Sequence, residues 1–173
     1  MRRTAAGEPT YNRIVTLEPG NPLPMLALRD LAGRPAKPPP GETLYAFFKT
    51  TCPTSELAWP YLERVRKIAE GGDLSILAVS QDDPATTRDF SRRLGLSIPT
   101  LYDPEPWTAS ERLGLTNVPT FLLVDRDGVI RDASVGFQRH KMQEFAGLAA
   151  RLAGRPVPVL FGPDENVPAI KPG

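Results

Sequence analysis

The sequence predicts an α/β fold in which a central mixed β-sheet carries helices on both faces. Two short apolar runs, residues 43–49 and 74–80, are rich in strand-forming residues and bounded by turn signals, which is typical of strands buried in a sheet. Residues 55–70, which lie between these runs, place apolar side chains at helical spacing and end at a pair of glycines. This order predicts two parallel strands joined by a right-handed helical crossover.

The segments after the second strand predict two more helices. Asp83 is expected to be the N-cap of a helix over residues 84–94, with Pro84 at its first position, where a missing N–H is tolerated. A second, shorter helix is expected within residues 105–115.

The last part of the domain predicts a β-hairpin followed by a helix. Residues 120–135 have the pattern of two strands joined at Asp127 and Gly128, a dipeptide typical of tight hairpin turns. Residues 140–152 place their apolar side chains on one face of a helix. An antiparallel hairpin added to the parallel pair makes the predicted sheet mixed.

Length and proline content predict one domain with two extensions. The chain has 173 residues, enough for one well-filled core, and its 20 prolines gather where regular structure is broken. We expect an N-terminal arm over residues 1–22, the folded domain over residues 23–153 and a proline-rich C-terminal extension over residues 154–173.

The C-terminal extension alternates apolar residues with prolines, a pattern that disfavours a helix. We therefore expect residues 157–170 to lie extended against the body of the domain. Val159, Leu160 and Phe161 supply the apolar surface for this docking.

Charge and hydropathy exclude several kinds of partner. The formal net charge is +1 with acidic and basic residues interspersed, so no nucleic-acid partner is expected. No segment has the length and hydropathy of a membrane span. Residues 1–20 contain no apolar run of the kind found in secretory signals, which predicts a cytoplasmic location, although a leader removed before Met1 would leave no trace. Nothing in the sequence sets the oligomeric state.

Cys52 is the only cysteine, and it lies between the first predicted strand and the first predicted helix. Free N–H groups and the positive end of the helix dipole stabilise an anion there, which favours a reactive thiolate. Pro53 suits a helix start, and Ser55 is expected to cap the helix or to donate a hydrogen bond to the sulfur. These residues alone are equally consistent with a small apolar side chain at a strand end.

A second stretch resembles a known family. Residues 113–130, LGLTNVPTFLLVDRDGVI, are similar to the thioredoxin-like superfamily, above all to the TlpA/ResA group of thiol-disulfide oxidoreductases and their AhpC/TSA-like relatives. The match is carried by Val118-Pro119-Thr120, Asp125, Gly128 and Ile130. The segments LPMLALRDLAGRP and TTCPTSELAWPYLERV resemble the first motif and the active-site helix of the family, so the resemblance spans residues 23–152.

The resemblance implies a thioredoxin-like fold with a cis peptide bond before Pro119, which faces Cys52. Since proline has no N–H, Pro119 leaves the backbone of Val118 free to pair with an extended substrate held over the thiol. The substrate-binding residues implied in this way are Thr51, Pro53, Val118 and Pro119.

This chain departs from the family pattern at two positions. Ser55 stands where the family has a second cysteine, and Thr51 stands where it has tryptophan. We therefore predict a thiol-disulfide oxidoreductase with a single nucleophile, Cys52, whose catalytic site includes Ser55. A mixed disulfide with a disulfide-containing protein then needs an external thiol such as glutathione. The sequence does not show whether Ser55 is natural or a Cys-to-Ser change.

Two other functions stay open. The segment TCPTSE resembles the C-P-T-E of peroxiredoxins, and a single thiol suits a one-cysteine peroxide reductase, but Tyr45 and Lys49 occupy positions where that branch has Pro and Thr. A redox-inactive domain that binds extended peptides beside Pro119 is the third reading. No cofactor or metal site is predicted, because His140, the only histidine, has no other ligands in local register.

Overall fold

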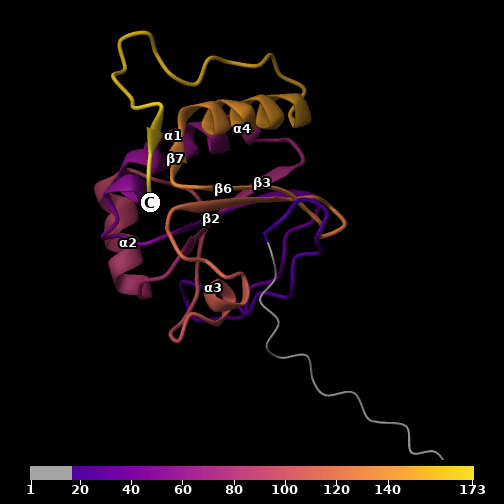
Figure 1. Cartoon of the computed structure of the whole chain (residues 1–173), viewed down its shortest axis with the longest axis vertical. Helices are drawn as coiled ribbons and strands as arrows, with labels where there is room; N and C mark the ends of the chain where they lie inside the picture. The colour runs from indigo at the N-terminus through magenta and orange to yellow at the C-terminus, as the bar shows by residue number, and fades with distance from the viewer. Residues whose placement is uncertain (1–16) are drawn as a thin grey trace, which may run out of the picture.

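The structure is a computed structural model that describes residues 17–173, so most of the predicted N-terminal arm, residues 1–16, lies outside the described residues. Within residues 17–173, six strands form a central mixed sheet in the order β1-β4-β3-β2-β5-β6 (Figure 1). These strands are β1 (Arg29–Asp30), β2 (Glu42–Phe48), β3 (Leu74–Ser80), β4 (Thr100–Tyr102), β5 (Thr120–Val124) and β6 (Ile130–Val135). A second, two-stranded sheet pairs β7 (Phe137–Gln138) with β8 (Ile170–Lys171).

The two predicted central strands are parallel neighbours, as expected. β2 pairs with β3 over its full length, and β5 pairs antiparallel with the other edge of β2. β2 ends one residue earlier than predicted, because the chain turns after Phe48. At that turn the N–H of Cys52 donates to the carbonyl oxygen of Lys49 at 3.2 Å. Lys49 therefore belongs to the loop that carries Cys52 and not to the strand.

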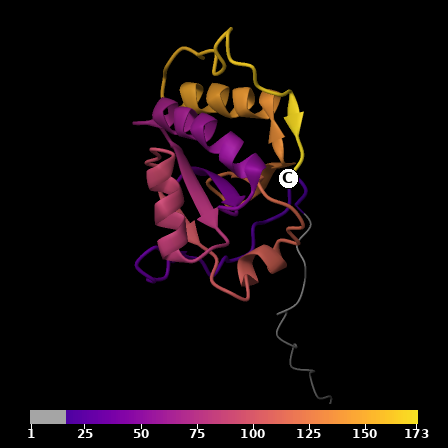
Figure 2. The same cartoon turned by 90° about the vertical axis from the view of Figure 1, so that its left-hand side faces the viewer.

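Helices cover both faces of the sheet, which confirms the predicted fold class (Figure 2). The helices are α1 (Pro53–Ala69), α2 (Pro84–Arg93), α3 (Thr108–Arg112) and α4 (Arg139–Leu152). Alternate residues of β2 point to opposite faces: Leu44 packs with residues of α1, α2 and α4, whereas Tyr45 packs with residues of α3 and of the segment before β1. No helix among residues 17–173 is long and apolar enough to cross a membrane.

The helix starts differ from the sequence prediction in instructive ways. α1 begins at Pro53, two residues before the predicted start, because proline at the first helical position has no N–H to leave unpaired. α2 begins as predicted, with the carboxylate of Asp83 accepting from the N–H of Thr86 at 3.0 Å. α3 is shorter than its predicted window, since Trp107 at its N-cap has left-handed backbone angles (φ 61°).

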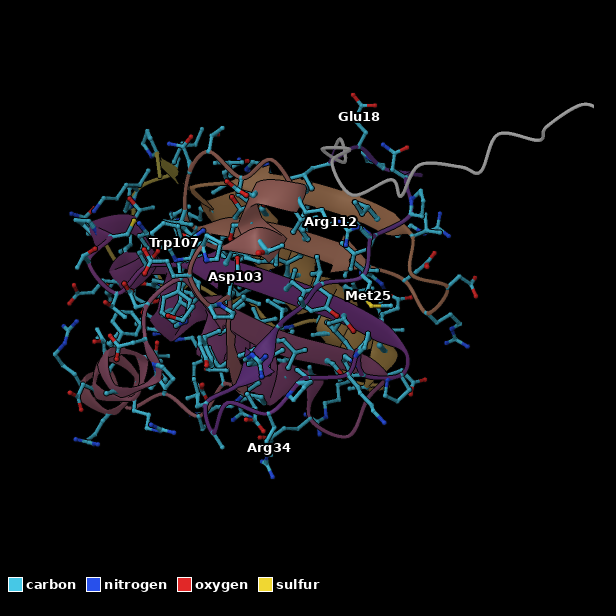
Figure 3. The ribbon with its side chains drawn as sticks, turned by 90° about the horizontal axis from the view of Figure 1, so that it is seen from below. Glu18, Met25, Arg34, Asp103, Trp107 and Arg112 are labelled. Atoms are coloured by element: carbon cyan, nitrogen blue, oxygen red, sulfur yellow. The ribbon has the colours of Figure 1, made fainter. Side chains whose placement is uncertain are left out.

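The side of the molecule shown in Figure 3 is tied together by polar contacts of α3. The carboxylate of Asp103, which is buried, accepts the N–H groups of Ala109 and Ser110 at 3.1 and 2.8 Å and so fixes the first turn of α3. Arg112 donates to the carbonyl oxygen of Met25 at 3.0 Å, which fastens α3 to the segment before β1. The short α3 is thereby held against the sheet.

The C-terminal extension lies against the body without forming a helix, as expected (Figure 1). Leu160 and Phe161 are buried, but Val159 is 84% exposed, so its predicted role in docking is wrong. The reason is local: Leu160 is held from both sides, by Gln143 at its N–H (2.8 Å) and by Arg64 at its carbonyl oxygen (3.0 Å). This fixes the direction in which each side chain of the extended segment points.

We expect acid to weaken the attachment of this extension. The hydrogen bond from Arg64, with that from the N–H of Gly162, lowers the pKa of Glu165 from 4.5 to about 2. A carboxylate with a lowered pKa stabilises the folded chain fully above its unfolded pKa, and this contribution is lost as pH falls through the folded pKa. The measurement is the free energy of unfolding in urea between pH 5 and pH 2, for the wild type and Glu165→Gln. The difference in free energy of unfolding between the wild type and Glu165→Gln should shrink as pH falls. A difference that stays constant would contradict the prediction.

Candidate active site

Cys52 lies at the junction between β2 and α1, where it is the N-cap of the helix. Its backbone is extended (φ −86°, ψ 116°), its carbonyl oxygen accepts the N–H of Glu56 at 3.0 Å, and Pro53 follows at the first helical position. No described side chain caps this end of α1. The thiol therefore lies at the N-terminus of a helix of 17 residues, where free N–H groups and the helix dipole make the local potential positive.

The loop before β5 brings Val118 and Pro119 to the same place. The Sγ atom of Cys52 donates to the carbonyl oxygen of Val118 at 3.3 Å, although 66 residues separate them. The Val118–Pro119 peptide bond is cis, and the carbonyl oxygen of Pro119 accepts the N–H of Gly136 at 2.8 Å. The structure thus places Cys52, Val118 and the buried Pro119 together.

Cys52 is partly exposed, so its sulfur can be reached from solvent while it contacts the carbonyl oxygen of Val118.

The charged residues on either side of Cys52 have other partners. Glu56 forms an ion pair with Arg93 at 2.5 Å, and the ammonium group of Lys49 lies over the ring of Trp107, 5.3 Å from its centre. Thr51 in the loop and Pro53 at the start of α1 are both exposed. The sequence analysis gave Trp107 no role. Its nearness to Lys49 depends on the left-handed turn before α3, which the sequence pattern does not show.

Two further polar residues at the site were missed by the sequence analysis. Thr54, which is buried, donates from Oγ1 to the carbonyl oxygen of Pro172 at 2.6 Å, and Asn117 donates from Nδ2 to the carbonyl oxygen of Gly173 at 3.2 Å. Both acceptors belong to the C-terminal extension. Figures 1 and 2 show this end of the chain beside the start of α1.

Comparison with known families bears on this arrangement. The sequence model of the family described as Redoxin matches residues 20–152, about three quarters of the chain. The chain belongs to the Redoxin family. A search of curated proteins found no match to this Redoxin.

Solved structures with similar folds include thiol-disulfide exchange proteins. A protein described as the thiol:disulfide interchange protein DsbE of Chlorobium tepidum is 19% identical, with a TM-score of 0.67 over 77% of this Redoxin and 98% of that chain. StoA from Bacillus subtilis is 16% identical (TM-score 0.58; 69% and 94% covered). A secreted Mycobacterium tuberculosis disulfide oxidoreductase homologous to Escherichia coli DsbE is 17% identical (0.58; 72% and 94%). These likenesses confirm the thioredoxin-like fold.

Ser55 does not make the contacts that the sequence analysis expected. Because α1 begins at Pro53, Ser55 lies inside the first turn, fully buried, and Cys52 occupies the N-cap. Its Oγ atom has no hydrogen-bond partner among the described residues, so Ser55 neither caps the helix nor donates to the sulfur. A buried hydroxyl without a partner costs about 1–3 kcal/mol. The pocket around this side chain therefore suits an apolar or sulfur-containing group better than a hydroxyl.

We expect Ser55→Ala to stabilise this Redoxin by about 1 kcal/mol, because the substitution removes the buried hydroxyl and leaves no polar partner behind. Ser110→Ala is the matched control: the Oγ atom of Ser110 is also buried but accepts from Gln81 at 2.9 Å, so its removal should destabilise. Urea unfolding of the three chains measures both effects. A loss of stability in Ser55→Ala as large as that in Ser110→Ala would show that the Ser55 hydroxyl is satisfied.

Proposed function

We propose that this Redoxin is a thiol-disulfide oxidoreductase that acts through Cys52 alone. The observation that carries the proposal is the position of this thiol, at the N-terminus of α1 and in contact with the loop of Val118 and Pro119. The interchange and oxidoreductase activities named for the similar structures support it. Within residues 17–173, no group of three or more His, Cys, Asp or Glu side chains could hold a metal ion. The proposed cycle uses neither a metal nor a cofactor.

The proposed reaction is an exchange of disulfide bonds. The Cys52 thiolate attacks one sulfur of a substrate disulfide, the substrate S–S bond breaks, and the departing thiolate takes a proton from water. Cys52 is then bonded to the substrate. An external thiolate such as that of glutathione attacks the substrate sulfur of this mixed disulfide. Cys52 leaves as a thiolate and the substrate is left bonded to glutathione, so each S–S bond that breaks is replaced by one that forms.

The residues around the thiol have separate tasks in this proposal. The backbone of Val118 pairs with an extended segment of the substrate, while Pro119, which has no N–H, leaves that pairing unobstructed. Thr51 and Pro53 flank the sulfur on the exposed side and contact the substrate there. Ser55 cannot attack a mixed disulfide, so resolution depends on the external thiol. A cytoplasmic location, which stays a prediction, would supply glutathione.

The test is capture of a peptide disulfide, followed by mass spectrometry. We expect one mixed disulfide per chain, which persists after excess reagent is removed, disappears on addition of reduced glutathione and does not form in Cys52→Ala. Two other outcomes would replace the proposal. Peroxide consumption that depends on Cys52, without disulfide capture, would indicate a one-cysteine peroxide reductase. Inertness to both reagents, with retained binding of an extended peptide, would indicate a redox-inactive binding domain.

A further inference from the structure

The last four residues of the C-terminal extension lie along the edge of the candidate active site. β8 pairs antiparallel with β7, which follows the Gly136 that hydrogen-bonds to Pro119. The backbone beyond β8 passes closely over Gly136: an added Cβ atom there would lie 2.7 Å from the carbonyl oxygen of Lys171 and 3.1 Å from the nitrogen of Gly173. The extension thus reaches the loop that carries Val118 and Pro119.

The end of this segment contacts the backbone of Val118 directly. A Cβ atom added to Gly173 would lie 2.4 Å from the carbonyl oxygen of Val118, so this position accepts only a residue without a side chain. That carbonyl oxygen is the one that accepts the hydrogen bond of the Cys52 thiol. Gly173 therefore occupies the side of Val118 at which an extended substrate would pair.

Two side chains recognise the carbonyl groups of this segment. Thr54, one residue beyond the start of α1, binds the carbonyl oxygen of Pro172, and Asn117, next to Val118, binds that of Gly173. Hydrogen bonds to successive backbone carbonyls do not depend on the side chains of the bound segment, so Thr54 and Asn117 would serve another extended peptide equally well.

We propose that residues 170–173 are a built-in competitor for the peptide substrate of Cys52. This inference rests on the proposed thiol-disulfide exchange and names its substrate class: an extended peptide whose carbonyl groups accept from Thr54 and Asn117. The substrate residue that lies against the carbonyl oxygen of Val118 is glycine, as Gly173 is here. Residues 170–173 must leave Thr54, Asn117 and Val118 before such a substrate can pair with Val118.

The way the extension is anchored allows residues 170–173 to lift away from Val118 while the earlier part stays in place. β8 has two residues, and Ile170 is 64% exposed. The firmer anchors, buried Phe161 and the ion pair of Glu165 with Arg64, lie earlier in the extension. Release of residues 170–173 therefore breaks few contacts and leaves the rest of the extension docked.

The first experiment compares the full chain with a chain that ends at Ala169. Three reagents react with Cys52 in each: iodoacetamide, which is small; fluorescein maleimide, which is bulky but needs no disulfide chemistry; and a glycine-containing peptide disulfide. Truncation removes the hydrogen bonds from Thr54 and Asn117 to this segment, so we expect the rates with the maleimide and with the peptide disulfide to rise roughly tenfold. The iodoacetamide rate should change less than twofold.

A second variant tests the same step without shortening the chain. Gly173→Ala forces a methyl group against the carbonyl oxygen of Val118, so the end of the segment must move and both rates should rise toward those of the truncated chain. Gly162→Ala is the matched control in the same extension, because its added Cβ atom would meet its nearest neighbour at an ordinary 3.5 Å. Its rates should equal those of the wild type, and thermal unfolding shows that each variant is folded.

The outcomes separate the two proposals. Unchanged maleimide and disulfide rates in both the truncated chain and Gly173→Ala would overturn the competitor. A tenfold rise with maleimide, but no reaction of any chain with the peptide disulfide, would show that the segment only covers Cys52 and would overturn the proposed exchange. A rise with iodoacetamide as large as that with the bulkier reagents would also contradict competition, since it would show that truncation alters the thiol itself.

Discussion

Ser55→Cys should turn the single-thiol site into a dithiol enzyme that reduces insulin with a dithiol reductant. Position 55 lies in the first turn of α1, three residues after the N-cap Cys52, a spacing at which side chains are neighbours and a disulfide can form. A neighbouring thiol attacks the mixed disulfide within the same molecule, so we expect the lifetime of that intermediate to fall at least about 100-fold. Ser55 is already buried in the first turn of α1 without a hydrogen-bond partner, so the larger sulfur loses no polar contact there.

Ser134→Cys is the matched control for this change. Ser134 is also buried and its Oγ atom also lacks a hydrogen-bond partner among the described residues, but it lies on β6, outside the turn that holds Cys52. A second cysteine there should leave the mixed disulfide as long-lived as in the wild type. Insulin turnover in both variants, or in neither, would contradict the role given to position 55.

The regular elements could be predicted from the sequence where local pattern and packing agree. β3 has the bounds 74–80 that were predicted, because its apolar run is closed on both sides by polar turn residues. The start of α1 was missed by two residues, since apolar spacing marks the buried face of a helix and not its first turn. That error explains the wrong prediction for Ser55, because in a helix that begins at Pro53 this side chain points into the core.

Some contacts of the candidate site could be predicted from the sequence, and others could not. The approach of Val118 to Cys52 could be expected from the family resemblance, which places the proline-containing loop against the cysteine. In the structure the Sγ atom of Cys52 lies 3.3 Å from the carbonyl oxygen of Val118. The contact of Thr54 with Pro172 joins residues 118 positions apart and depends on where the extension crosses the domain. Local sequence contains no signal for that path. The left-handed turn at Trp107 was hidden for a similar reason, because nothing in its residue type favours such a backbone.

Truncation of Phe161 to alanine should be the most destabilising single change in the C-terminal extension, at about 3 kcal/mol. The ring is 4% exposed, lies 4.8 Å from the ring of Tyr61 in α1 and 6.3 Å from that of Phe137 in β7, and carries the guanidinium group of Arg139 at 5.0 Å. Its loss leaves a cavity where the extension meets the main core. A loss of this size lowers the melting temperature by roughly 6–12 °C in a chain of this length.

Val159→Ala is the control, because Val159 lies in the same extended segment but its side chain is 84% exposed. Its truncation should change the free energy of unfolding by less than about 0.5 kcal/mol. Urea unfolding followed by tryptophan fluorescence compares the two, since Trp59 lies fully buried in the same core as Phe161. If Phe161→Ala were as mild as Val159→Ala, the extension would not share the unfolding of the domain. In that case Phe161 would not hold the extension on the domain, and residues 170–173 would compete with substrate without this anchor.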